Sequence, residues 1–256
     1  MCSTSSDILL RIFQVPRQVS SIIDYLSDSD RILLNNITNA YQSVSEQAIA
    51  VRQRQLHFPP TLVKFINNET EIHQSLIQYY KLLPEFQQLA LTNQVLLIKS
   101  NLAKIIHLHC LLIDQFRENS SIGSHMTKWV GNDFHLGMSQ ARRSFHRFVE
   151  HPLILKLALI IFIFVMELSV PHYSNASDEY SHENDIRACQ DLYTSLLWRY
   201  LISIQGEREA IQSMNIIVRQ ILRFQILMNV MEETLRRQAI EEPVNQLEVS
   251  LFRLQC

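Results

Sequence analysis

Glycine is scarce in this sequence, with four residues among 256, and proline adds only seven. Loops that cradle phosphate groups depend on glycine, and the sequence contains neither a P-loop nor a dinucleotide-binding glycine fingerprint. Three of the glycines fall within residues 118–137. We therefore expect a loop in this stretch, with room for one short β-hairpin around Trp129 and Val130.

Cysteine is equally sparse, and no two cysteines form a C-x-x-C pair. This spacing excludes a zinc-finger module and provides no disulfide framework. The amino terminus, MCSTSSDILLRIFQV, lacks a basic leader followed by an uninterrupted apolar run, so we expect no signal peptide and a reducing compartment. A net charge of -2 gives no broad basic surface, and we expect no direct contact between this chain and DNA.

Motifs that carry catalytic chemistry are also missing, including the G-x-S-x-G elbow and the H-E-x-x-H zinc motif. His107, His109 and Cys110 form a local cluster, but residues two apart on a helix point away from each other. A role in the core or in lining a pocket is favoured over a metal site, which needs three or four ligands. We expect no enzyme activity, no metal and no cofactor.

One apolar segment, Pro152 to Val170, could be mistaken for a membrane span. Its uncharged centre is short and is bounded by Lys156 and Glu167. A span needs roughly 20 apolar residues, so we interpret the segment as a helix buried on all sides and expect no membrane contact.

Apolar residues at helical spacing, separated by proline and glycine, predict helices along most of the chain. Ser27 and Asp30 have the spacing of a capping box. The predicted helices cover 27–47, a long helix from Pro59-Pro60 to Leu83, 92–116, 138–149, the segment after Pro152, 185–206, 207–238 and the segment after Pro243; 172–184 is predicted as a loop. The expected fold is all-α, a layered helical sandwich of about nine to twelve helices. Residues 1–26 are interpreted as a hinge-like lead-in and residues 27–256 as one domain.

Leu108, Leu111 and Leu112 match the LxxLL signature of peptides that dock on nuclear receptors. A docking motif has to be exposed, whereas these leucines lie in the middle of an apolar helix. We expect them to belong to the core.

Residues 79–99, YYKLLPEFQQLALTNQVLLIK, contain a proline between two amphipathic halves, each with a lysine near its outer end. The stretch resembles the signature of helices 3 to 5 of the nuclear-receptor ligand-binding domain, commonly FAKxxPGFxxLxxxDQxxLLK. The matching positions are Lys81, Pro84, Phe86, Leu89, Gln94, Leu97 and Lys99. Glu85, Asn93 and Ile98 stand where the family usually has Gly, Asp and Leu.

The resemblance implies a groove that binds LxxLL-type coregulator helices. By this resemblance Lys81 is the clamp lysine, Lys99 flanks the groove, Val95 and Leu76 line its floor, and Glu248 on the last helix holds the other end of the peptide. The alternative is that the two lysines are simply solvated beside a core stripe.

The resemblance also implies a ligand pocket. Its expected lining is strongly apolar and suits a fatty or sterol-like molecule, or side chains that fill the space themselves. The residues are Phe65, Ile72, Ala103, Ile106, Cys110 and Ile113. Ile113 and Ile72 occupy positions where related receptors often carry a ligand-anchoring arginine and glutamate, and Leu159 replaces the usual acidic residue of helix 8. An orphan receptor is therefore the expected type.

Two further features concern regulation. Asn245 and Gln246 replace the apolar pair that opens the family's activation helix, which questions ligand-dependent closure. Residues 207–238 would supply the surface for a homodimer or heterodimer. The resemblance thus implies a protein of the nucleus, or of the nucleus and cytoplasm, that regulates transcription. The alternative is a receptor-fold scaffold or dimerisation module without ligand response.

Overall fold

The computed structural model describes residues 25–54, 61–118, 120–166, 183–241 and 243–251. These residues form α-helices and one 3-10 helix, and no strand is found among them, which confirms the all-α prediction. The helices are α2 (Asp28–Arg54), α3 (Leu62–Asn68), α4 (Thr70–Lys81), α5 (Pro84–Gln87), α6 (Leu91–Ile113), α7 (Ser120–Trp129), α8 (Asn132–Ser144), η1 (Phe145–Phe148), α9 (Leu153–Ile163), α10 (Glu183–Gln238) and α11 (Gln246–Leu251).

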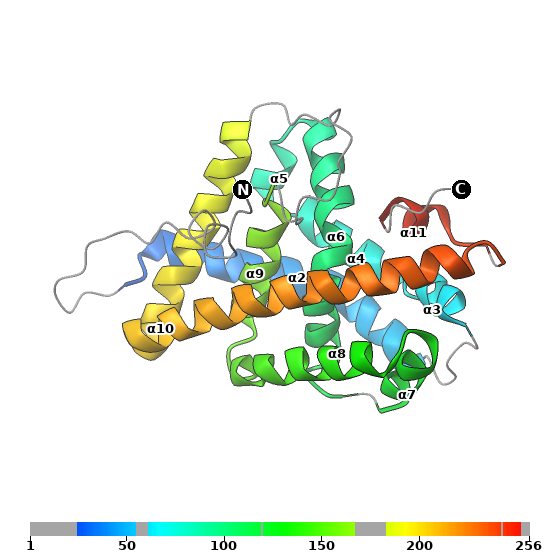
Figure 1. Ribbon diagram of the computed structural model, residues 1–256. Coiled ribbons are helices and arrows are strands. Elements are labelled where there is room, and N and C mark those ends of the chain that lie inside the picture. Colours follow the sequence, from blue (N-terminus) through cyan, green and yellow to red (C-terminus); the bar gives the residue numbers. More distant parts are fainter. Residues whose placement is uncertain (1–24, 55–60, 119, 167–182, 242, 252–256) are drawn as a thin grey trace, which may run out of the picture.

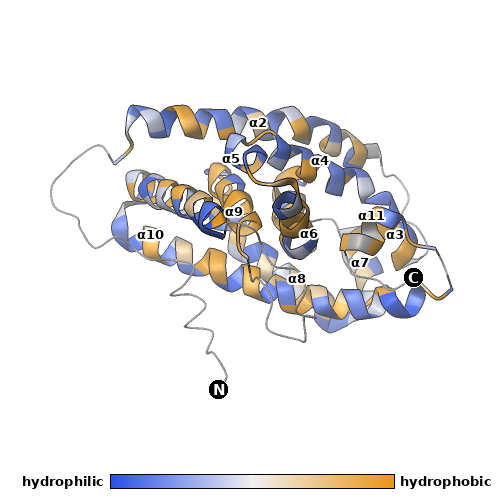
Figure 2. Cartoon of the chain, turned by 90° about the horizontal axis from the view of Figure 1, so that it is seen from above, coloured by the Kyte–Doolittle hydropathy of each residue, from blue (hydrophilic) through white to orange (hydrophobic). Residues whose placement is uncertain are grey.

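The helices are arranged in three layers (Figures 1 and 2). Helices α6 and α9 pack against each other in the middle, between α2 and α4 on one side and α10 on the other. Helix α8 packs on α10 and α7 packs on α8. This arrangement confirms the expected layered sandwich.

Helix α9 is the centre of the hydrophobic core. Every residue from Ile154 to Ile163 except Lys156 is buried, as expected for a helix that is apolar on all sides. By length and composition alone, one described helix, α6, could cross a membrane, and half of its most apolar window is buried inside the protein.

The glycine-rich stretch differs from the prediction, because α7 and α8 replace the expected loop and β-hairpin. Gly131 joins the two helices with a φ of 133°, a conformation that side chains disfavour. Gly137 lies inside α8, where an added Cβ would come within 2.8 Å of Leu227 on α10. These glycines therefore serve a helix junction and a close helix contact, and the hairpin prediction around Trp129 and Val130 was wrong.

The long helix predicted up to Leu83 is divided in two. Its break lies at Glu69, between α3 and α4, where the Glu69 backbone N–H donates to Phe65 and Ile66 of the preceding turn. The side chain of Glu69 is buried at the break, which no helical spacing in the sequence indicates. The predicted stop before Pro84 is confirmed, because α4 ends at Lys81 and α5 begins with that proline.

Two predicted helix ends are confirmed in detail. The Ser27 N–H donates to the Asp30 carboxylate and the Asp30 N–H donates to Ser27 Oγ, each over 3.1 Å, which is a complete capping box. Gly206 divides α10 into two straight parts with φ 78° and ψ 167°, so the first part ends where its glycine cap was expected. Residues 1–24, and residues 172–182 of the predicted loop, lie outside the described part of the chain.

Candidate functional site

The signature stretch folds into a compact junction of α4, α5 and α6. Phe86 is fully buried, and the Gln94 side chain on α6 donates to the carbonyl oxygens of Leu89 at 2.8 Å and Gln87 at 3.3 Å. These bonds satisfy carbonyl groups at the end of α5, where a helix leaves them without partners. Gln94 and Phe86 therefore fix the direction in which α6 leaves the junction.

An exposed surface lies on this junction. Leu91 is 73% exposed, Val95 is 41% exposed, and Lys99 follows one turn later on the same face of α6. Lys81 is exposed in the last turn of α4, and Leu82 beside it is 46% exposed. We call these five exposed residues, three apolar and two cationic, the α4–α6 surface.

Leu76 and Glu248 are the other two predicted groove residues. Leu76 is fully buried in α4, so it offers no surface to a peptide. Glu248 belongs to α11, which packs against α6, but its side chain lies outside the described atoms. Lys81 also lies at the negative end of the α4 dipole, which favours a cation there for structural reasons alone.

The six predicted pocket residues divide among three helices. Ala103, Ile106, Cys110 and Ile113 lie on one face of α6 at spacings of three and four, with Ile106 and Ile113 buried. Ile72 is fully buried on α4. Phe65 on α3 packs against Trp129 of α7, with ring centroids 5.5 Å apart.

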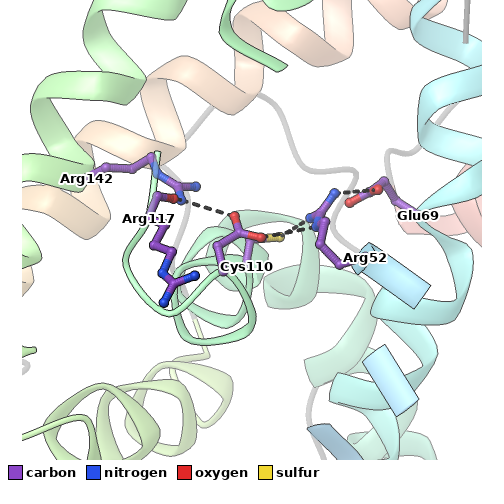
Figure 3. Close-up of polar contacts among 6 residues, drawn as sticks. Arg52, Glu69, Cys110, Arg117 and Arg142 are labelled. Atoms are coloured by element: carbon purple, nitrogen blue, oxygen red, sulfur yellow. Dashed lines mark hydrogen bonds and ion pairs between the residues drawn. The ribbon is translucent and has the colours of Figure 1, made fainter. Parts of the chain in front are cut away.

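A buried network of charges borders this face, and no spacing in the sequence indicates it because its members come from separate elements (Figure 3). Arg52 on α2 binds Glu69 at 2.8 Å and Asp114 at 3.2 Å, and Arg142 on α8 binds Asp114 at 3.0 Å. Arg142 also donates to the Arg117 carbonyl oxygen at 2.9 Å. The network ties α2, α8 and the end of α6 together around two positive and two negative side chains.

Cys110 touches this network, since Arg52 Nη2 lies 3.6 Å from its Sγ. Burial raises the pKa of the Cys110 thiol to about 12, so the sulfur is a neutral thiol at pH 7. Burial alone would lower the pKa of Arg52, but the charges of Glu69 and Asp114 outweigh it and raise that pKa above its ordinary value. Arg52 therefore stays positively charged in the folded protein.

His109 is held in a buried relay between α2 and α4. Ser75 Oγ donates its one proton to the Ile72 carbonyl oxygen, so it accepts a hydrogen bond from His109 Nε2 at 2.8 Å. The other ring nitrogen, Nδ1, then accepts from the Tyr41 hydroxyl at 2.8 Å. This tautomer cannot act as a base toward Ser75, which disfavours a nucleophilic serine.

His107 points to another helix, with its ring 5.1 Å from that of Phe224 on α10. The interpretation that the two histidines diverge is therefore confirmed. Burial lowers the pKa of each to about 3, so both rings are neutral at pH 7. Across the described residues no group of three metal-binding side chains comes together. Leu108 and Leu111 of the LxxLL match are fully buried, which confirms their assignment to the core.

The chain matches no protein-family model, and no curated protein matches it at a significant level.

Proposed function

We propose that this chain is a nuclear-receptor-like ligand-binding domain that regulates transcription in the nucleus by binding LxxLL-type coregulator helices. The observation that carries the proposal is the α4–α6 surface, where Leu91 and Val95 are exposed and Lys81 and Lys99 are exposed cations. An apolar area of this kind on a helix junction suits the leucine face of an amphipathic helix.

The lysines supply the polar contacts with the bound coregulator helix. A bound helix presents free carbonyl groups and a partial negative charge at its carboxyl end, and a lysine there forms charge-assisted hydrogen bonds. Lys81 is our choice for this role because it is exposed at the end of α4, directly before the exposed Leu82.

The proposal includes an apolar ligand next to the face of α6 that carries Ala103, Ile106 and Cys110. Ala103 and Cys110 are half-buried, so each keeps some accessible surface. The Cys110 thiol is nevertheless deep enough that burial is the main cause of its raised pKa. Side chains that are deep in the protein yet accessible are suited to border a small internal ligand.

Dimerisation through residues 207–238 is the third part, and the exposed side of α10 favours a second copy of this chain. Ile226 is 64% exposed and Val230 is 45% exposed, four residues apart on one face of the second part of α10, the helix that Figure 1 shows running across the front of the molecule. In an antiparallel pair centred on Ile226, Arg219 of one copy faces Glu233 of the other, because each lies seven residues from the centre. Leu222 faces Val230 by the same symmetry.

Charge reversal tests this register. Glu233 binds Arg236 and Arg237 of its own chain only at 3.9 and 3.8 Å on the exposed surface, so these weak pairs leave it available. Glu233→Arg should dissociate the dimer in analytical ultracentrifugation, and adding Arg219→Glu should restore it. The alternative is a heterodimer with another protein. A wild-type chain that sediments as a monomer would support that alternative.

The main experiment measures binding of a fluorescently labelled LxxLL helix to the purified chain by anisotropy. Lys81→Ala should weaken binding about tenfold, the effect of losing one charge-assisted contact of about 1.4 kcal/mol. Lys128→Ala is a matched control, because Lys128 is also an exposed lysine in the last turn of its helix, α7. It should leave the affinity unchanged.

Val95→Asp should abolish binding, because it places a charge in the apolar part of the surface. Addition of cholesterol or oleate to the same assay tests the ligand. A wild-type chain that binds no peptide with or without lipid would contradict the coregulator proposal. It would leave the second candidate, a receptor-fold scaffold or dimerisation module without ligand response.

A further inference from the structure

Helix α11 is too short to hold its position by itself. It spans six residues, Gln246–Leu251, and isolated helices shorter than about 12 residues are marginal in water. Its apolar residues give it one anchor, since Leu251 is buried and Leu247 and Val249 are half-buried on a helix that contacts α6. Its first residues, however, are polar, and something else must hold that end.

The end is held by a reciprocal pair of asparagines. The Asn67 side chain at the end of α3 donates to the Pro243 carbonyl oxygen at 3.1 Å and accepts from the Asn245 backbone N–H at 2.9 Å. The Asn245 side chain returns the contact, donating to the Asn67 carbonyl oxygen at 3.4 Å and to Thr70 Oγ at 3.2 Å. Each asparagine thus binds the backbone of the other.

The contact uses both functions of the Asn67 amide. Asn67 donates to Pro243 and accepts from Asn245, on either side of Val244, so its side chain must be both a donor and an acceptor. Thr70 Oγ donates to the Asn67 carbonyl oxygen at 2.8 Å, so it is free to accept from Asn245. Pro243 restricts the backbone that enters the contact, which lowers the entropy lost on forming it.

The α3 side of the contact is tied to other helices by ion pairs. Asn67 lies two residues before Glu69, whose buried carboxylate binds Arg52 at 2.8 Å, and Arg52 reaches Asp114 at the end of α6. The joint between α3 and α4 is therefore fixed to α2 and α6 by charges, and the asparagines fix α11 to that joint. None of these contacts involves a ligand.

We propose that Asn67 and Asn245 are positioning residues that hold α11 in its docked place independently of any ligand. The inference rests on the proposed function in one respect, namely that docked α11 completes the coregulator surface. It also gives a role to Asn245, the residue that replaces an apolar one in the resembling family. Ligand-driven closure of the last helix is unnecessary where a polar contact already closes it.

Hydrogen exchange of the α11 amides in the full chain tests the contact without any coregulator. The Val249 amide, bonded to the Asn245 carbonyl oxygen at 2.9 Å, is the reporter. Asn67→Ala and Asn245→Ala should each speed its exchange about tenfold, as expected for losing about 1.4 kcal/mol of local stability. The double variant should add little, because either substitution breaks the same pair.

Matched controls are Asn68→Ala, an exposed asparagine beside Asn67, and Gln246→Ala, an exposed residue beside Asn245. Both should exchange as the wild type does, and amides of α9 should be unchanged in all variants as a check of folding. Wild-type exchange rates in both alanine variants, or equal acceleration in the controls, would overturn the proposal.

A ligand arm tests independence. Cholesterol or oleate should change exchange at Val249 less than twofold, and a tenfold slowing by either lipid would overturn ligand independence. Peptide binding separates this inference from the proposed function. If the wild type binds no LxxLL helix while both alanine variants speed exchange, the proposed function fails and the asparagine contact stands.

Discussion

Acidification should weaken this protein through His109. The ring is fully buried and neutral, with both nitrogens engaged by Ser75 and Tyr41, and burial lowers its pKa from 6.5 to about 3. The unfolded chain has an ordinary histidine, so it binds a proton that the folded chain does not. Stability is therefore complete above pH 6.5 and falls progressively as the pH drops toward the folded pKa.

The size follows from the two pKa values. At pH 5.5 a histidine with an unfolded pKa of 6.5 is about nine-tenths protonated, while the folded ring remains neutral. Proton binding then favours the unfolded state by about 1.4 kcal/mol, compared with about 0.1 kcal/mol at pH 7.5. That is a sizeable part of the stability of an ordinary domain.

Urea denaturation at pH 7.5 and pH 5.5 measures the effect in wild type and in His109→Gln. Glutamine can donate to Ser75 and accept from Tyr41 but cannot take up the proton. The variant should lose about 1.4 kcal/mol less between the two pH values than the wild type. His146→Gln, at an exposed histidine, is the control and should follow the wild type. Equal losses in wild type and His109→Gln would refute the neutral, buried relay.

Other substitutions test the fold. Gly206→Ala should cost about 1–3 kcal/mol in urea denaturation, because a side chain is disfavoured at φ 78° and ψ 167° although the space is open. Arg52→Met should cost about 3–5 kcal/mol by leaving the carboxylates of Glu69 and Asp114 buried without their shared cation; a loss below about 1 kcal/mol would contradict that view. Asp30→Ala should cost about 1–2 kcal/mol by removing the capping box. The Arg199 contact lowers the pKa of Asp30 below 3.8, so the stability that the Asp30 carboxylate contributes in the wild type should be lost only in acid below that pH. Thermal melts at pH 3 and pH 7 measure that difference.

Local signals in the sequence were sufficient for three helix boundaries. The Ser27 and Asp30 spacing, Pro84 and Gly206 each act within a few residues, and each marks a boundary in the structure. The β-hairpin was wrong because a glycine that permits close helix packing cannot be distinguished from a turn glycine without its neighbour, here Leu227 for Gly137. That neighbour lies far along the chain.

The candidate site was only partly predictable for the same reason. Helical spacing places Val95 and Lys99 on one face and shows that two histidines diverge. It cannot show that Arg52, Glu69 and Asp114 meet, because the three come from different elements and no periodicity relates them. The Asn67 and Asn245 contact joins residues even further apart.

Two departures from the pattern of the resembling family lie at contacts between helices in this structure. Glu85, at the usual glycine position, accepts a hydrogen bond from the buried Tyr193 hydroxyl, which ties α5 to α10. Leu159, at the usual acidic position, offers its carbonyl oxygen to Tyr80 at 3.2 Å, which ties α9 to α4. These contacts hold helices together at two of the positions where the sequence departs from the pattern, and the Leu159 contact uses a backbone carbonyl that any residue would offer.

The charge network also restricts which ligand suits the proposed pocket. Ile113 offers no cation, and the guanidinium in contact with Cys110 belongs to Arg52, which already binds Glu69 and Asp114. A ligand carboxylate could recruit it only by displacing a buried ion pair, and breaking such a pair costs about 3–5 kcal/mol. An uncharged sterol-like molecule meets no such cost. The residues around Cys110 therefore favour a neutral apolar ligand over a fatty acid.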